Sequence, residues 1–145
     1  MGSFLDQIEP LKQAAVAEMK AAADLPALER LYGAPDGPDY FCPAMLEEGI
    51  FYGVREGGEL AAAAGTHIVS RMEGVAAIGN VYTRSARRGK GLGMRVTSAV
   101  IGALSAVPTV VLNVREANAG AIRIYERLGF ARHCAFLEGR LIRRD

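Results

Sequence analysis

The feature that most restricts the fold of this 145-residue chain is a basic, glycine-rich turn between a strand-like and a helix-like segment. An apolar run over residues 75–83 precedes the turn, and a helical pattern over residues 91–104 follows it. The turn itself has the sequence Arg88-Gly89-Lys90-Gly91-Leu92-Gly93, followed by Met94. A strand, a tight turn and a helix in this order are typical of a sheet covered by helices.

The turn also has the properties of an anion-binding site. The first N–H groups of a helix have no partner within the helix, and the helix dipole adds partial positive charge there. Glycines let the backbone approach an oxyanion, and Arg87, Arg88 and Lys90 can add charge-assisted hydrogen bonds. The spacing matches neither a Walker loop nor the dinucleotide pattern G-x-G-x-x-G. The spacing alone leaves two alternatives. The turn is either a pyrophosphate site or a flexible basic turn, which could also contact nucleic acid.

The other hydrophobic patterns predict a mixed α/β (α+β) domain. Helices are expected over residues 11–23, 26–32 (with Asp24 as its cap), 43–48 and 118–128. Strands are expected over residues 50–55, 59–70, 75–83 and 109–114, with a final strand pair within 131–143. We expect residues 1–145 to form one domain, in which 1–48 are a helical N-terminal segment and 50–143 the core.

Charge and apolar content exclude several classes of protein. The 17 basic and 16 acidic residues leave a net charge of +1, which is not that of a polyanion-binding protein. Five basic residues lie between Arg84 and Arg95 without interleaved aromatic residues, which disfavours a nucleic-acid partner. No apolar run could span a membrane and no signal-peptide pattern opens the chain, so we expect a cytoplasmic protein. Cys42 and Cys134 lack metal-ligand spacing, so we expect buried, reduced thiols and no metal site.

A second constellation lies in residues 118–130. Asn118 suits a helix N-cap, and Gly129 suits a left-handed helix end. Ala121 and Tyr125 are four residues apart and therefore share one face of the predicted helix. Taken alone, Tyr125 would be interpreted as a core aromatic residue whose hydroxyl lies at the rim of the core.

Together, the two segments resemble the GNAT superfamily of acyl-CoA-dependent N-acetyltransferases. Arg88, Gly91 and Gly93 match the pattern R/Q-x-x-G-x-G/A of that family. Its pattern N-x-x-A-x-x-x-Y-x-x-x-G-F is matched by Asn118, Ala121, Tyr125, Gly129 and Phe130. The resemblance covers residues 50–138, and the stretch 58–130 is most similar to the FR47-like branch. It implies a mixed, mostly antiparallel sheet flanked by helices and splayed between strands 75–83 and 109–114.

The resemblance also implies the residues that bind acetyl-CoA. Backbone groups of Val81, Tyr82 and Thr83 would bind the pantetheine arm in the splay. The pyrophosphate would bind at the turn formed by Arg88, Gly89, Lys90, Gly91, Leu92, Gly93 and Met94. Asn118 would contact the cofactor near the thioester, and Tyr125, one helical turn after Ala121, would face the sulfur.

One departure from the family concerns the N-terminal region. The family's sheet usually begins with a strand, whereas residues 1–4 are too short for one and residues 11–23 are helix-like. We therefore expect a sheet that lacks its first strand. Because a bare sheet edge invites association, a homodimer would cover it.

The implied reaction is transfer of an acetyl group from acetyl-CoA to a primary amine of a small molecule or peptide, by direct attack of the amine. A backbone N–H near Val81 is the candidate oxyanion donor. Tyr125, a phenol of pKa about 10, is the candidate acid for the leaving thiolate. The strand 75–83 has no Asp or Glu, so His67 is the candidate base, although the more common role of such a residue is that of a satisfied histidine on a sheet face. The missing carboxylate leaves a non-catalytic acyl-CoA-binding module as the alternative function, and the sequence does not identify the acceptor.

Overall fold

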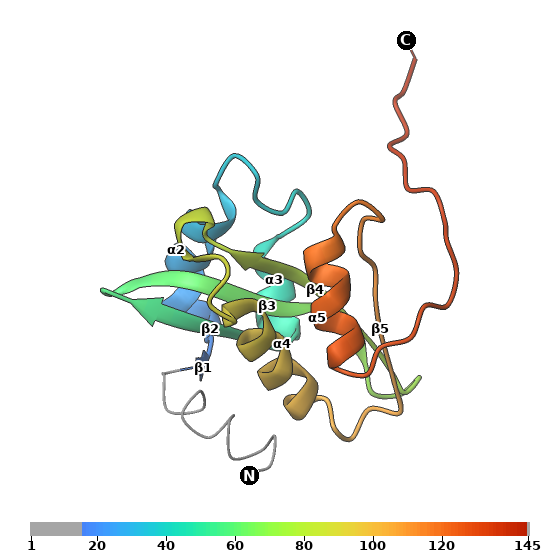
Figure 1. Ribbon diagram of the computed structural model, residues 1–145, viewed down its shortest axis with the longest axis horizontal. Coiled ribbons are helices and arrows are strands. Elements are labelled where there is room, and N and C mark those ends of the chain that lie inside the picture. The colour runs from blue at the N-terminus through green and yellow to red at the C-terminus, as the bar shows by residue number, and fades with distance from the viewer. Residues whose placement is uncertain (1–15, 145) are drawn as a thin grey trace.

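The computed structural model describes residues 16–144, which form a five-stranded sheet with helices on both faces (Figure 1). The strands lie in the order β1-β2-β3-β4-β5, and every neighbouring pair is antiparallel except β4 and β5, which are parallel. The strands are β1 (Val16–Glu18), β2 (Phe51–Glu56), β3 (Glu59–Ser70), β4 (Val75–Thr83) and β5 (Thr109–Leu112). The expected mixed, mostly antiparallel sheet flanked by helices is therefore confirmed.

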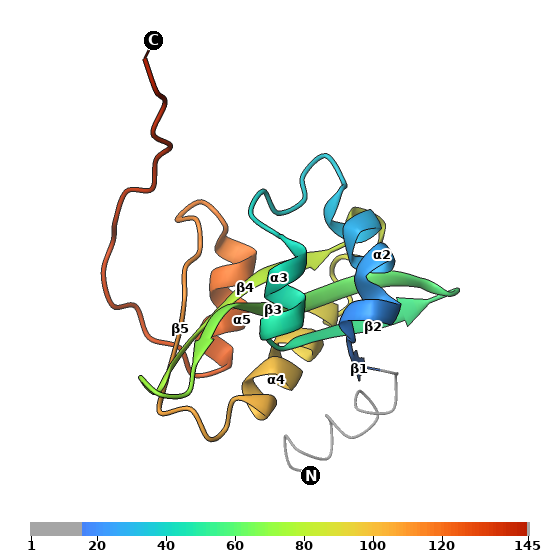
Figure 2. The same cartoon turned by 180° about the vertical axis from the view of Figure 1, so that it is seen from behind.

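The helices divide between the two faces of the sheet. Helices α4 and α5 lie over one face (Figure 1), and α2 and α3 lie over the other (Figure 2). The helices are α2 (Ala21–Tyr32), α3 (Pro43–Glu48), α4 (Leu92–Ala103) and α5 (Ala119–Arg127), with a short 3-10 turn, η1 (Ser85–Arg87), before α4. Within residues 16–144, no helix combines the length and the apolar character that crossing a bilayer requires.

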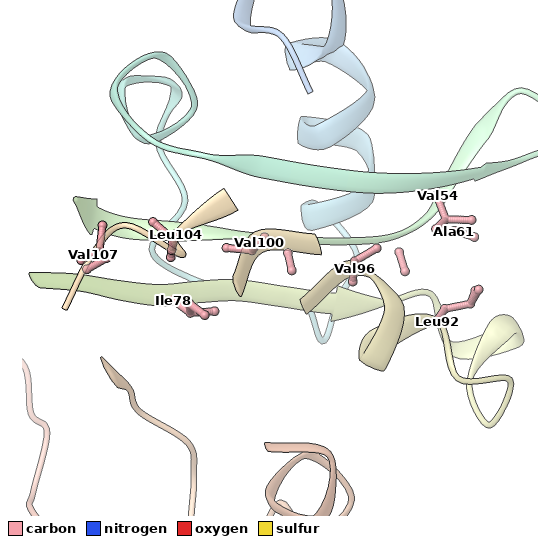
Figure 3. Close-up of a cluster of buried hydrophobic side chains, with 11 residues drawn as sticks. Val54, Ala61, Ile78, Leu92, Val96, Val100, Leu104 and Val107 are labelled. Carbon is pink, nitrogen blue, oxygen red and sulfur yellow. The ribbon is translucent and has the colours of Figure 1, made fainter. Parts of the chain in front are cut away.

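One core lies between α4 and the sheet. Leu92, Val96 and Val100 are spaced by four residues and are buried along one side of α4, facing the strands (Figure 3). Their neighbours on the sheet include Ala62 and Ile78, which are also buried. Each such aliphatic side chain stabilises the fold by about 1.5–3 kcal/mol when it leaves water. This packing fixes where α4 begins, and so fixes the position of the glycine-rich turn.

A second core lies under α2 and α3. Leu28 and Leu31 of α2 are fully buried and pack with Phe51 of β2. The Phe51 ring covers Gly65 on the neighbouring strand, where an added Cβ would lie 2.3 Å from the ring. This core anchors the loop between α2 and α3, which reaches across the end of β4.

The N-terminal prediction needs two corrections. Residues 16–18, expected to be helical, form β1, which pairs with β2, and α2 begins at Ala21 instead of residue 26. The good helix formers here are overruled by tertiary pairing, because Met19 is buried and donates its backbone N–H to Phe51 O at 2.8 Å. Asp24 lies in the first turn, where Oδ2 accepts from Lys20 N at 2.7 Å. The sheet edge that was expected to be bare therefore carries a short strand. The predictions made for residues 1–4 and 11–15 concern positions outside the described residues.

The expected strand pair within residues 131–143 is absent. Residues 131–144 form no helix or strand, and their side chains, such as Leu137 and Leu141, are exposed. The segment leaves the body of the domain (Figure 1), so it has neither a partner strand nor a face to pack on, which an isolated hairpin needs. Cys134, in this segment, and Cys42, before α3, are free but exposed, so the expected burial of both thiols is wrong.

Candidate active site

Strand β4 separates from β5 halfway along its length. The two strands pair from Val75 with Thr109 to Ile78 with Leu112, and β4 then continues to Thr83. Over the rest of β4, no strand within residues 16–144 pairs with this edge. Backbone N–H and C=O groups that point to this edge are therefore available to a ligand. This is the place at which Val81, Tyr82 and Thr83 were predicted to bind pantetheine.

The separation begins at a bulge centred on Asn80. Gly79 lies opposite Gly65 and Tyr82 lies opposite Ala63, so β4 has one extra residue in this stretch. Asn80 has φ 52°, the only positive φ of a non-glycine residue in the described part of the chain. Because a bulge changes the alternation of side chains, it redirects the last residues of the strand.

The residues before and after the bulge pack into different cores. Ile78, before the bulge, packs against α4, whereas Tyr82, after it, packs with α2 and α3. The Tyr32 hydroxyl of α2 donates to Asn80 O at 2.6 Å and so holds the bulge from that side. Burial raises the pKa of Tyr32, so its hydroxyl remains a donor throughout the physiological range.

The glycine-rich turn leaves the start of α4 open. Gly91, the N-cap, has φ 77° and Gly89 has φ 79°, both in the left-handed region that favours glycine. No side chain caps α4, and a Cβ on either glycine would meet no atom within 4 Å. The first N–H groups of α4 therefore face open space, as an oxyanion site requires.

Gly93, the third motif glycine, brings three elements together. An added Cβ would lie 3.6 Å from Ile124 Cδ1 of α5 and 3.7 Å from Thr83 Oγ1 of β4. The first turn of α4, the end of β4 and the middle of α5 therefore meet at this position. The two motifs are more than twenty residues apart in the chain, but the fold makes them neighbours.

Arg88 and Arg87 are already paired with carboxylates. Arg88 Nη2 lies 2.6 Å from Asp36 Oδ2, and Arg88 Nε donates to Thr83 O at 3.0 Å. The Tyr82 hydroxyl donates to Asp36 Oδ1 at 2.5 Å, and this bond and the one from Arg88 lower the pKa of Asp36. Arg87 Nε lies 2.9 Å from Glu56.

The sequence pattern did not predict Asp36. It lies in the loop after α2, where a Pro-Asp-Gly stretch indicates a turn but not the partner of its carboxylate. Its contact with Arg88 places an acidic group beside the turn that was predicted to bind phosphate. A diphosphate and Asp36 would therefore compete for the same guanidinium.

Helix α5 has the predicted ends. Asn118 Oδ1 accepts from Ala121 N at 3.1 Å, and Gly129 has φ 98°. Tyr125 is half-buried, with its ring edge-on to Phe130 at a centroid distance of 6.2 Å, and burial raises its pKa. The Asn118 side chain acts as the helix cap, while Tyr125 lies one residue after the contact between Ile124 and Gly93.

His67 lies on the α3 side of the sheet. With Cys42, Met45 and Glu48 it lines a hollow of about 180 Å³ between α3 and the end of β3. Its ring covers Gly79, where an added Cβ would lie 1.9 Å from Nε2, so His67 adjoins the bulge. Tyr125 belongs to α5, over the opposite face (Figures 1 and 2), so the candidate acid and base are on either side of the unpaired edge of β4.

Comparisons with known proteins match this chain to a family model and to several solved structures. The sequence model described as the acetyltransferase (GNAT) family matches residues 18–130. A putative GNAT-family acetyltransferase from Novosphingobium aromaticivorans has 33% identity and a TM-score of 0.70, covering 80% of this chain and 51% of that protein. This chain thus spans about half the length of that relative. A search of curated protein sequences finds no match.

Two further solved structures have 26% identity. A putative acetyltransferase from Agrobacterium tumefaciens has a TM-score of 0.69, with 88% of this chain and 99% of that protein covered. A ribosomal-protein alanine N-acetyltransferase from Escherichia coli has a TM-score of 0.67, with 83% and 79% covered. The similarity therefore extends over nearly the whole length of the first of these proteins and about four-fifths of the second.

Proposed function

Since the chain belongs to the acetyltransferase (GNAT) family, we propose that it transfers an acetyl group from acetyl-CoA to a primary amine of a small molecule or peptide. The proposal rests on one observation: two parts of the structure that are open to a ligand meet at Gly93. One is the uncapped start of α4, and the other is the unpaired edge of β4. Together they offer N–H groups for a diphosphate and a strand edge for an extended arm.

The residues fit such a donor. Backbone N–H groups of residues 89–94, including those of Lys90, Leu92 and Met94, would hold the diphosphate, with Arg88 able to leave Asp36 and add a charged contact. Backbone groups of residues 81–83 would hold the pantetheine arm. Acetyl-CoA supplies an activated acyl carbon, and these contacts would place it at the bulge.

The proposed reaction forms one bond and breaks one. The lone pair of the amine nitrogen forms a C–N bond with the acyl carbon, the C–S bond breaks, the nitrogen loses a proton and the thiolate gains one. Tyr125 is the proposed acid, since burial raises its pKa and keeps the phenol protonated. His67 is the proposed base because it adjoins the bulge from the α3 side, and the backbone N–H of Val81 is the proposed oxyanion donor.

Ligand-dependent stability tests the donor part of the proposal. Acetyl-CoA at a hundred times its Kd should stabilise the chain by about 2.7 kcal/mol, or raise its Tm by roughly 10 °C. An unchanged Tm at millimolar acetyl-CoA would refute the proposed donor. CoA itself should give a similar shift, and 3′-phosphoadenosine a smaller one.

Product detection by mass spectrometry tests the transfer. The amines are a peptide with N-terminal alanine, chosen because the Escherichia coli relative is an alanine N-acetyltransferase, together with spermidine, methylamine and the ε-amine of lysine. The proposed function requires an acetylated product from at least one of them. Binding of acetyl-CoA without any product would instead indicate the non-catalytic acyl-CoA-binding module.

Three finer statements complete the proposal. We propose that the chain belongs to the FR47-like branch, on the resemblance of residues 58–130, and that it acts in the cytoplasm. Because β1 pairs only with residues 52–54 of β2, and β5 has no outer partner strand within residues 16–144, we also propose a homodimer that covers a sheet edge. Sedimentation equilibrium of the full chain would give the mass that tests the last statement.

A further inference from the structure

Asn80 carries a buried polar atom for which the fold supplies no partner. The residue is 5% exposed, its backbone oxygen accepts from Tyr32, and Nδ2 donates to Met45 Sδ at 3.4 Å. Oδ1 is buried and forms no hydrogen bond within residues 16–144. Turning the amide over would leave the NH₂ group without an acceptor instead, so either orientation leaves one polar atom unpaired. An unpaired buried oxygen costs free energy and calls for a physical reason.

The backbone of Asn80 adds a second, independent cost. Its φ of 52° lies in the left-handed region, which asparagine tolerates better than most residues but which is still unfavourable. Such strain collects at sites where the surrounding structure needs one particular backbone arrangement. Here the strain and the unpaired oxygen coincide on one residue, at the point where β4 leaves β5.

The position of Asn80 indicates which ligand group would meet Oδ1. Met45, which contacts Nδ2, also lines the hollow that contains His67, and the His67 ring covers Gly79, the residue before Asn80. Asn80 therefore contacts one residue that lines this hollow and follows the glycine that another covers, on the α3 side of the sheet. An amide oxygen only accepts hydrogen bonds, so its partner must be a donor. The acetyl group has no donor, and the amide N–H groups of the pantetheine arm are already assigned to the strand edge at residues 81–83, whereas an attacking amine brings its own N–H groups.

We propose that Asn80 binds the acceptor amine: Oδ1 accepts a hydrogen bond from its N–H and so orients the nitrogen lone pair toward the acyl carbon. The inference rests on the proposed acetyl transfer and extends it to a residue that neither family motif contains. A neutral amide suits this task, because a carboxylate at the same place would favour the protonated ammonium, which has no lone pair to attack. The acceptor is therefore an amine that enters from the α3 side and arrives, or becomes, uncharged at the bulge.

Two variants of the full chain separate this role from a structural one. Asn80→Gly removes the side chain, and glycine adopts the positive φ of this position without steric strain. Asn80→Asp keeps an oxygen acceptor and adds a charge. The probes are methylamine and spermidine as acceptors, acetyl-CoA binding measured by calorimetry, and Tm.

The expected results differ between probes. Asn80→Gly should lower kcat/KM for both amines by about 10- to 100-fold, the size of one hydrogen bond in the transition state. It should leave acetyl-CoA affinity and Tm essentially at wild-type values. Asn80→Asp should keep or lower the KM for amine and move the pH–rate profile toward higher pH, because the bound amine must then lose its proton against the added charge.

Two outcomes would overturn the inference. One is amine acetylation by Asn80→Gly at the wild-type rate. The other is a parallel loss of amine transfer, acetyl-CoA affinity and Tm, which is what a merely structural residue would cause. A wild-type chain that binds acetyl-CoA but acetylates no amine would refute the proposed function itself, and the role of Asn80 with it, and this result is recognised before any variant is made.

Discussion

The substitution Tyr125→Phe separates chemistry from packing at the proposed acid. The Tyr125 ring packs edge-on against Phe130 at an interplanar angle of 74°, and phenylalanine would keep that contact. Within residues 16–144, the Tyr125 hydroxyl forms no hydrogen bond to the protein, so no partner is left unpaired when it is removed. The variant should therefore fold like the wild type, with a free energy of unfolding changed by less than about 0.5 kcal/mol.

The effect on the rate should be much larger. A general acid contributes about 10²- to 10⁴-fold, which corresponds to roughly 3–5 kcal/mol in activation free energy. A proton given to the thiolate is needed in the transition state and not in the bound ground state, so acetyl-CoA affinity should stay the same. The predicted loss in activation free energy thus exceeds the predicted change in stability severalfold.

The pH dependence gives a second readout. Burial raises the pKa of Tyr125 above the ordinary phenol value of about 10. The acid form is the protonated one and is lost only as pH rises through the raised pKa. The wild-type rate should therefore show no alkaline decline caused by this group below about pH 10, and the variant should have a lower rate across the whole range.

Single-turnover kinetics with acetyl-CoA and the best amine probe would measure the chemical step. Tyr52→Phe is the matched control, since it removes a hydroxyl from β2, away from the unpaired edge of β4. If Tyr125→Phe turns over like Tyr52→Phe, Tyr125 is a packing residue. If stability and acetyl-CoA affinity fall together, its hydroxyl has a structural role and the acid lies elsewhere.

Three further substitutions test other parts of the structure. Gly91→Glu should abolish CoA binding in thermal-shift assays while the chain stays folded, because it places a negative charge at the open start of α4, where a Cβ meets no atom within 4 Å; wild-type CoA affinity in this variant would remove the turn from the site. Asp36→Asn should tighten CoA binding about two- to fivefold in calorimetry by releasing Arg88, and weaker binding would contradict the proposed competition. Gly65→Ala should lower the free energy of unfolding in urea by about 1–3 kcal/mol, since the new methyl group would overlap the Phe51 ring, and an unchanged midpoint would show that the ring can move aside.

Local sequence was sufficient to predict the structure wherever a few neighbouring residues determine the backbone conformation. Gly57 and Gly58 lie between the strands expected over residues 50–55 and 59–70, and both have the positive φ of the tight turn that joins β2 to β3. Asn118 and Gly129 begin and end α5 as predicted, because a cap bonds within its own turn. The two motifs identified the family for the same reason, since each is a short run whose residue types reflect local geometry.

Local sequence was insufficient to predict the structure wherever contacts with a distant segment determine the secondary structure. Residues 16–18 favour a helix on propensity, yet they form a strand because the edge of β2 offers hydrogen bonds and a buried place for Met19. Residues 131–143 have a strand-like pattern, yet the fold provides no partner for it. A strand is stabilised by its neighbours, so its pattern indicates a capacity to pair and not the pairing itself.

The candidate site divides in the same way. Residue types alone determined that the turn at residues 88–93 suits an anion and that Tyr125 shares a helix face with Ala121. The contact of Asp36 with Arg88 and the bulge at Asn80 were decided only by the tertiary structure. Each depends on register and packing between segments that are tens of residues apart, and the free energy of those contacts is not contained in either segment alone.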